Sequence, residues 1–320
     1  MRLYIIKRLL LAVPTIVVVS IIIFLLIHIA PGDPVRVMLG PIQDDVLVQR
    51  IREQLGLNLP LYQQYFRWAG NALHGDFGFS VSVHRGAPVI ELLLQRYLVT
   101  LELAFLSMII ATLIAFPAGI LSAIRQNTWV DHTTRIIALL GISTPSFFLG
   151  ILFILFFGVH LLQPWATGGF VPISEGLANN LLHLLLPSIA LGAAFAAIVM
   201  RMLRSSMLDV MGSDYVRTSR AMGIPRPKMI RRDIVKNALI PVITVMGNAV
   251  GYLLAGSIVT ETVFRLPGVG NLVINAVYRR DFPVIQGIVL SIVVIRILVN
   301  LIVDVVYAAI DPRIRYGRVS

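Results

Sequence analysis

The sequence predicts an all-α integral membrane protein with six transmembrane helices, and two observations lead to this prediction. Hydrophobic residues make up 57% and charged residues 13% of the 320 positions, and the mean hydropathy is +0.86, which is unlike a soluble domain. The apolar residues also gather in runs of about 20 or more, the length that a helix needs to cross a bilayer core. These runs span residues 9–30, 98–124, 136–162, 181–203, 239–260 and 284–310.

The distribution of charge between the runs predicts the orientation. An even number of spans places both termini on one side, and the segments on that side carry 17 basic residues against five acidic ones. The segments on the other side carry nine against eight. Because cytoplasmic segments are enriched in lysine and arginine, both termini are predicted to be cytoplasmic. The net charge of +11 therefore reflects orientation and phospholipid headgroups rather than nucleic-acid binding.

Several kinds of chemistry are excluded or unsupported by the sequence. There are no cysteines, so no disulfide or thiolate nucleophile can form. No phosphate loop of the G-x-x-x-x-G-K-[ST] type and no HExxH, GxSxG or strand-associated GxGxxG motif is present. We therefore expect no catalytic residues, no metal site and no cofactor in this chain. The first apolar run is too long for a cleaved signal, and no small-residue cleavage site follows it.

Residues 1–97 are predicted to form the first transmembrane helix and an extracytoplasmic loop that caps the membrane domain. The PGDP sequence at 31–34 is expected to stop the first helix. Residues 44–55 and 60–74 are predicted to be amphipathic helices, closed by Gly56 and Gly75. The following residues, 76–83, are expected to be extended or irregular.

Residues 98–310 are predicted to form a five-helix core, and residues 311–320 a basic cytoplasmic tail. The third run contains the sequence STPS at 143–146, where a helix should break. In the fifth run, small residues indicate close contacts between helices. They are Gly247, Gly251 and Gly256.

Five polar residues within the runs are candidates for the translocation pathway or a seam between subunits. Arg296, Asn300 and Asp304 are four positions apart, so they form one stripe on the last helix. An arginine near the middle of a bilayer normally faces protein or water and indicates function. Alternatively, the stripe packs against a neighbouring helix, where Arg296 pairs with a carboxylate. Glu102 and Glu261 lie near the outer helix ends, where they are either ligands for a substrate amine or ordinary headgroup-level residues.

The six histidines lie mostly on the outer side, and none are spaced four positions apart. Histidine suits nickel, so a path for a metal chelate is one interpretation. Scattered interfacial histidines are the interpretation that we favour.

The densest charge lies in residues 214–241, between the fourth and fifth runs, with seven basic residues against two acidic ones. The pattern is that of a helix, a break and a second helix. Asp214 is expected to cap a short helix that runs to Met222, and Gly223 to adopt the left-handed conformation after its end. Pro225 is expected in the first turn of the next helix.

This stretch resembles the cytoplasmic "EAA" loop of permease subunits of binding-protein-dependent ABC importers. The sequence YVRTSRAMG at 215–223 is similar to the version in the dipeptide, oligopeptide and nickel branch. Gly223 matches the family's central glycine, whereas Arg217 stands where the family's leading glutamate would be. The PGDP, QLGL and GDFGFS sequences of the outer loop, and the sequence from Glu261 to Gly270, extend the resemblance over nearly the whole chain.

The resemblance implies a type I ABC importer permease fold and a subunit that forms half of a translocation pathway in the bacterial inner membrane. It implies four partner subunits: a second homologous permease, two ABC ATPase subunits that hold ATP and Mg, and an extracytoplasmic substrate-binding protein. The coupling helix in the loop would dock on an ATPase, and its movement would switch the access of the cavity. The residues that the resemblance assigns to coupling are Tyr215, Arg217, Thr218, Arg220, Ala221, Met222, Gly223 and Ile224.

The substrate class stays open at this point. Dipeptides and oligopeptides are the main expectation, and nickel or metal chelates and glutathione are the alternatives within the family. A secondary transporter, which would carry its own coupling-ion acids near the middle of the membrane, is the alternative from another class. An intramembrane enzyme would need a paired nucleophile and base, and no such pair can be placed.

Overall fold

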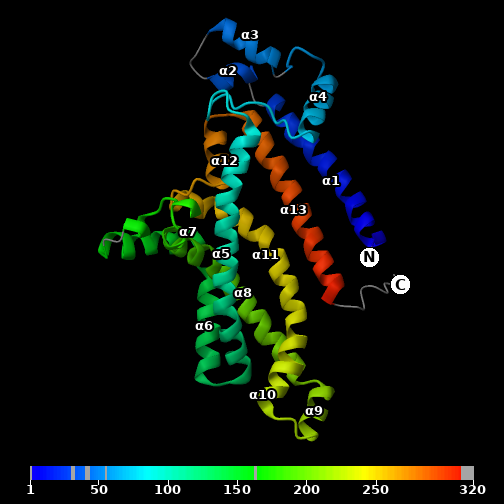
Figure 1. The fold of residues 1–320 in the computed structure, drawn as a ribbon, viewed down its shortest axis with the longest axis vertical. Coiled ribbons are helices and arrows are strands. Elements are labelled where there is room, and N and C mark those ends of the chain that lie inside the picture. The colour runs from blue at the N-terminus through cyan, green and yellow to red at the C-terminus, as the bar shows by residue number, and fades with distance from the viewer. Residues whose placement is uncertain (1, 30–32, 40–43, 55, 162–163, 311–320) are drawn as a thin grey trace. The chain divides into compact units, whose positions relative to one another are not determined.

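The computed structural model describes residues 2–29, 33–39, 44–54, 56–161 and 164–310. Within these ranges all regular secondary structure is helical (Figure 1). Within these ranges the one pairing of strand type is an isolated β-bridge between Phe79 and Pro88. The chain divides into two compact units. The first comprises residues 1–99 and 267–301, and the second comprises residues 100–266 and 302–320. The predicted tail, 311–320, lies outside the described residues.

The described residues of the first unit form seven helical elements, two of which, α5 and α13, continue into the second unit. They are α1 (Arg2–Ile29), α2 (Pro34–Leu39), α3 (Asp45–Gln54), α4 (Leu61–Leu73), the beginning of α5 (Val89–Ile124), α12 (Val269–Tyr278) and most of α13 (Phe282–Ile310).

The helices α3 and α4 confirm the two amphipathic helices predicted in the outer loop. Gly56 and Gly75 follow them with φ of +69° and +83°, as closing glycines should. The expectation for the PGDP sequence was incomplete, because its second proline begins α2. Asp33 Oδ1 accepts a hydrogen bond from the Val35 N–H at 3.1 Å, which caps this extra helix.

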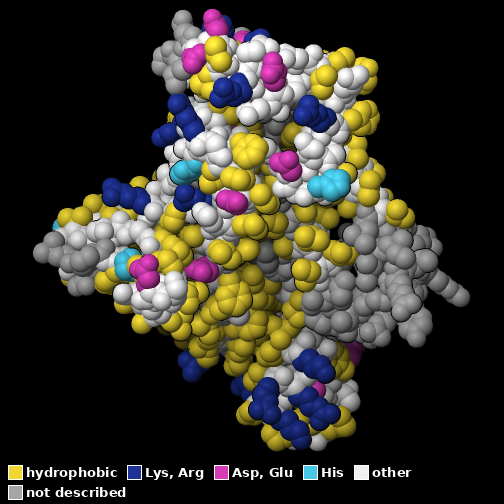
Figure 2. All heavy atoms as spheres, turned by 45° about the horizontal axis from the view of Figure 1, so that its top comes forward, with side chains coloured by type: hydrophobic (Ala, Val, Ile, Leu, Met, Phe, Trp, Pro, Cys, Tyr) yellow, Lys and Arg dark blue, Asp and Glu magenta, His cyan; other side chains and the backbone are white. Residues whose placement is uncertain are grey.

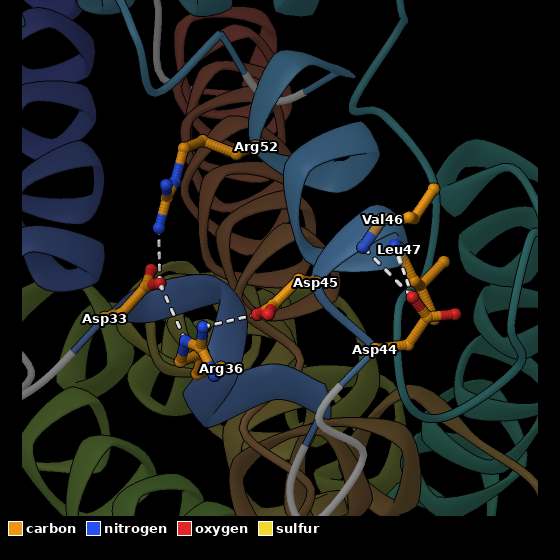
Figure 3. A network of polar contacts seen from close by, with 7 residues as sticks. All are labelled: Asp33, Arg36, Asp44, Asp45, Val46, Leu47 and Arg52. Carbon is orange, nitrogen blue, oxygen red and sulfur yellow. Dashed lines mark hydrogen bonds and ion pairs between the residues drawn. The ribbon is translucent and has the colours of Figure 1, made fainter.

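A polar network joins α2 to α3 (Figure 3). Arg52 Nη2 donates to Asp33 Oδ2 at 2.5 Å, and Arg36 Nη2 donates to Asp45 Oδ1 at 2.7 Å. Asp44 Oδ1 caps α3 by accepting from the N–H groups of its first turn at 3.0 and 3.3 Å. Because these side chains are partly or largely exposed, the network contributes little free energy; the buried Val35, Leu39 and Val48 side chains hold the two helices together.

An aromatic cluster fixes α4 against α1. The Phe24 ring lies 5.5 Å from that of Tyr65 and 6.0 Å from that of Trp68, measured between centroids. His28 Nε2 lies 3.0 Å from Gln64 Oε1, so this histidine has a structural partner inside the chain.

The core of the first unit lies where α5, α12 and α13 meet. Fully or nearly fully buried residues from all three helices pack there. A Cβ on Gly287 would come within 2.7 Å of Val89 Cγ1, so α13 and α5 approach closely only because residue 287 is glycine. The buried cluster consists of Val89, Leu92, Leu93, Val269, Leu272, Ala276, Val284 and Ile288.

The second unit is built around α8 (Leu177–Met211), which packs on α5, α6 (Trp129–Ser143), α7 (Ser146–Phe153) and α11 (Lys236–Val263). A Cβ on Gly192 would lie 2.8 Å from the Ser107 carbonyl oxygen, which shows how closely α8 approaches α5. By contrast, no described atom lies within 4 Å of a Cβ at Gly251, so the close contact predicted there is absent from the described part of the chain. The smaller elements of this unit are a π-helical turn (Ile154–His160), two 3₁₀ turns (Pro164–Thr167 and Ile173–Glu175), α9 (Asp214–Ala221), α10 (Arg226–Met229) and a second π-helical turn (Ile230–Val235).

Four described helical segments are long and apolar enough to cross a membrane: Leu10–Ile29, Val89–Ile124, Leu177–Met211 and Phe282–Ile302. A fifth span results if Trp129–Ser143 and Ser146–His160 are counted together, although they meet at 99°. Their junction confirms the predicted break at the STPS sequence. The fifth apolar run lies within α11, a 28-residue helix with some side chains outside the described ones.

Three of the four single-helix spans, those of α1, α5 and α13, leave most of their residues unburied. Only 24% of the α1 span and 33% of the α13 span is buried, compared with 61% for α8. Figure 2 shows the exposed hydrophobic side chains as a broad yellow surface. Such exposure is what helices in contact with lipid require.

Candidate functional site

The candidate coupling loop begins with α9, and its first turn differs in detail from the sequence prediction. Ser213, not Asp214, occupies the N-cap position, with the extended backbone angles φ −72° and ψ 153°. Asp214 lies in the first helical turn and forms a 3.5 Å ion pair with Arg217. Both side chains are largely exposed, so this pair adds little stability.

The end of α9 confirms the predicted role of glycine. Gly223 has φ +72°, its N–H donates to the Arg220 carbonyl at 3.1 Å, and the Ile224 N–H donates to the Ser219 carbonyl at 3.2 Å. This pair of hydrogen bonds defines a Schellman motif, in which a left-handed residue reverses the chain. No described atom lies within 4 Å of a Cβ built on Gly223, so the backbone conformation, not space, requires glycine.

The two faces of α9 differ. Val216 and Ser219 are buried against the rest of the unit. Met222 is 68% exposed and Tyr215 is 45% exposed. The other predicted coupling residues, Arg217, Thr218, Arg220, Ala221 and Gly223, are exposed as well, and Ile224 is half-buried.

Behind α9, the chain continues in helical form to α11. Pro225 is the N-cap of α10, so the expectation that it lies in the first turn was wrong, because Pro227 takes that place. Asn237, which the sequence did not single out, joins the two ends of the loop. Its Nδ2 donates to Tyr215 OH at 3.1 Å and to the Asp233 carbonyl at 2.7 Å.

The two glutamates that were candidates for the pathway contact neighbouring helices of the second unit. Glu261 is fully buried, and the Thr100 hydroxyl donates to its Oε1 at 2.7 Å. Glu102 is half-buried, and Asn180 Nδ2 donates to its Oε2 at 3.1 Å. These contacts connect α5 to α11 and to α8.

The predicted stripe on α13 is partly described. Arg296 and Asn300 are exposed on this helix, and the side chain of Asp304 lies outside the described ones. Among the described residues, none forms an ion pair with Arg296. Arg296 and Asn300 belong to the first unit, whereas Glu102 and Glu261 belong to the second.

The sequence did not predict that two aspartates, Asp131 and Asp281, are buried and bind several hydrogen-bond donors. Asp131 is fully buried and accepts hydrogen bonds from Arg204 Nε at 2.6 Å, Arg204 Nη2 at 2.8 Å and Ser122 Oγ at 2.6 Å. Asp281 is also fully buried and binds the segment that begins at Ser80. The sequence offered only their charge as a signal.

In the part of the chain that the structure describes, no group of three histidine, cysteine, aspartate or glutamate side chains is placed to hold a metal. His74 and His183 contact backbone carbonyls one turn earlier in their own helices, at 2.8 and 2.9 Å. Together with the contact of His28, these bonds give three of the six histidines local structural partners.

Comparisons with known proteins place the chain in a family. The model of the binding-protein-dependent transport system inner membrane component matches residues 115–316, and the N-terminal model of the same systems matches residues 1–104. The chain is 44% identical over 313 residues to the glutathione transport system permease protein GsiC of Escherichia coli strain K12, covering 98% of this chain and 99% of that protein. The GsiC protein of Shigella dysenteriae serotype 1 (strain Sd197) gives the same values.

Solved structures agree on the fold. An inward-facing MetNI methionine ABC transporter has a chain that matches with a TM-score of 0.57 and 20% identity, over 69% of this chain and 96% of that one. A chain of an amino acid ABC transporter matches with a TM-score of 0.52 and 16% identity, over 68% and 94%. With the family matches, these findings confirm the predicted family and the predicted membrane location. The chain therefore belongs to the inner membrane components of binding-protein-dependent transport systems, as a permease subunit of an ABC importer.

Proposed function

We propose that this subunit forms half of the translocation pathway of an ATP-driven importer for short peptides, with glutathione as the first substrate to test. The observation that carries this proposal is the 44% identity to a glutathione permease across 98% of the chain. Glutathione is itself a tripeptide, so the expected peptide substrate and the glutathione alternative describe the same chemical class. A nickel chelate is the alternative that the experiment must separate.

The proposed assembly contains a second homologous permease, two ATPase subunits that bind ATP and Mg, and an extracytoplasmic binding protein. In this assembly the chain crosses the membrane six times, with α11 as a span and both termini in the cytoplasm. The charge asymmetry of the sequence supports this topology, because 17 of the basic residues fall on the side of the termini.

The proposed coupling surface consists of residues 215–224. Figure 2 shows lysine and arginine side chains gathered where this loop lies. Tyr215 and Met222 are exposed apolar side chains that suit a hydrophobic groove, whereas Arg217 and Arg220 suit acidic residues at its rim. Tyrosine and arginine are among the residues that contribute most to interface energies. Closure of the ATPases would move this loop and so switch the access of the pathway.

Uptake by the reconstituted transporter tests the proposal. Proteoliposomes that contain both permeases and both ATPases, with binding protein outside and ATP inside, are expected to accumulate labelled glutathione. Unlabelled tripeptides should compete, and a nickel–histidine chelate should not. Competition by the chelate alone would favour the metal alternative, and uptake without ATPase subunits would favour a secondary transporter.

A further inference from the structure

A cavity of about 800 Å³ lies in the second unit, between α6 and α8. Its lining combines three arginines with the apolar side chains of α6. The arginines are Arg135 from α6 and Arg201 and Arg204 from α8, and His132 lies beside them. Its described lining includes none of residues 215–224, Glu102 or Glu261.

The cavity has a positive charge. Its described lining contains no acidic residue, and the Asp131 carboxylate, which bonds the lining residues Arg204 and Ser122, is fully buried. This carboxylate accepts four hydrogen bonds, two from Arg204, one from Ser122 Oγ and one from the Asn127 N–H at 3.0 Å. Even when Asp131 is counted against the three arginines, two positive charges remain.

Asp131 holds the Arg204 guanidinium in one orientation. Asp131 pairs with its Nε and Nη2 atoms, at 2.6 and 2.8 Å, and the side chain is only 18% exposed. Within the described part of the chain, no residue accepts from Nη1. An oriented guanidinium with an available N–H group is a favourable donor to a phosphate oxygen.

The apolar wall of the cavity continues outward along α6. Ile136 is 59% exposed and Leu139 is 63% exposed, and both line the cavity. At the beginning of the same helix, Trp129 is 86% exposed, and tryptophan is enriched at the level of the lipid headgroups. Arg135, at the basic end of the cavity, thus lies within two helical turns of Trp129. The apolar wall, formed by Ile136 and Leu139, continues along α6 away from this tryptophan.

We propose that this cavity binds an anionic phospholipid, with the headgroup phosphate at Arg135, Arg201 and Arg204 and an acyl chain along the exposed face of α6. Basic pockets between membrane helices on the cytoplasmic side are suited to anionic headgroups. A soluble anion would use the arginines and leave the apolar wall without a function. The proposal depends on the membrane location of the subunit and not on its transported substrate.

Native mass spectrometry of the purified, delipidated transporter tests this site. Phosphatidylglycerol is expected to bind more tightly than phosphatidylethanolamine with the same acyl chains. The double variant Arg135→Gln/Arg201→Gln should weaken phosphatidylglycerol binding on the order of 30-fold, at about fivefold for each arginine near an anionic surface. Arg204 is left intact, because Asp131 needs it for folding.

Arg125→Gln is the matched control, since this exposed arginine lies at the same end of the unit and does not line the cavity. It should leave phosphatidylglycerol binding unchanged. Equal binding of the two lipids, or equal losses in the double variant and the control, would overturn the proposal. Inorganic phosphate is a second probe, and binding of free phosphate that depends on the two arginines while lipid retention does not would also overturn it.

Discussion

Ser80 and Asp281 lie 201 positions apart in the chain, and the Ser80 hydroxyl donates a 2.6 Å hydrogen bond to the buried Asp281 carboxylate. The N–H groups of Ser82 and Val83 each donate to the same carboxylate at 2.9 Å, and that of Val81 donates at 3.3 Å. The Asp281 side chain, which follows α12, therefore orders residues 80–83 between α4 and α5, where no helix or strand satisfies the backbone.

The first prediction concerns this carboxylate. Asp281→Ala should leave these donors without a partner, at a cost of about 1–3 kcal/mol for each one that stays buried. We expect a lower thermal midpoint of the purified permease and faster trypsin cleavage at the exposed Arg85. Asp76→Ala is the control, since Asp76 is exposed and accepts one backbone bond, from Gly78 at 2.8 Å. Equal effects of the two variants would show that Asp281 does not hold the loop.

The second prediction concerns Gly223. Because nothing described lies within 4 Å of a Cβ there, a substitution acts through the backbone at φ +72°. Gly223→Val should strain the turn by roughly 1–3 kcal/mol, leave membrane insertion intact, weaken co-purification of the ATPases and abolish transport. Gly223→Asn, which tolerates this conformation, should retain most activity. Normal assembly and uptake by the valine variant would mean that the loop is only a topology signal.

The third prediction compares a buried ion pair with an exposed one. Arg204→Gln removes the counter-charge of the fully buried Asp131, and breaking such a pair costs about 3–5 kcal/mol. Arg217→Gln breaks the exposed pair with Asp214 and should not change the thermal midpoint of the isolated permease. The double variant Asp131→Asn/Arg204→Gln should recover part of the loss. If both single variants unfold at the same temperature, the buried pair has no special role.

The fourth prediction concerns Arg296. An arginine at the centre of a membrane helix costs about 2.5–3.5 kcal/mol on insertion scales, so we expect it to face water or the second permease. In this cysteine-free chain, Arg296→Cys should react with a water-soluble thiol reagent in the assembled transporter. Leu298→Cys, about half a turn away and 49% exposed, should not. Equal protection of both cysteines, or a structure with Arg296 against acyl chains, would contradict this expectation.

The fifth prediction concerns orientation. A reporter fused after Ser320 should be cytoplasmic, and one inserted at Asn58 should be extracytoplasmic. The reason is the excess of basic residues on the side of the termini. Reporter enzymes that are active on only one side of the membrane provide the measurement, through their activity in each fusion. Detection of both reporters on the same side would refute the six-helix topology.

The sequence by itself determined the features that depend on neighbouring residues. Hydrophobic runs predicted the helices, and glycines predicted where α3, α4 and α9 end, because a left-handed residue is a local requirement. The STPS sequence predicted a break, since proline limits the residue before it. The basic loop at 215–223 and the outer-loop motifs were enough to identify the family.

Only the tertiary structure decided which charges are buried and what they contact. In the sequence, Asp131 and Asp281 are single acidic residues in loops or at helix ends. Their most distant donors, Arg204 and Ser80, lie 73 and 201 positions away, and no local pattern encodes such a partner. The 99° angle between α6 and α7 is likewise set by packing, because proline interrupts a helix without fixing the direction of the next one. Long-range packing, not local propensity, places these side chains.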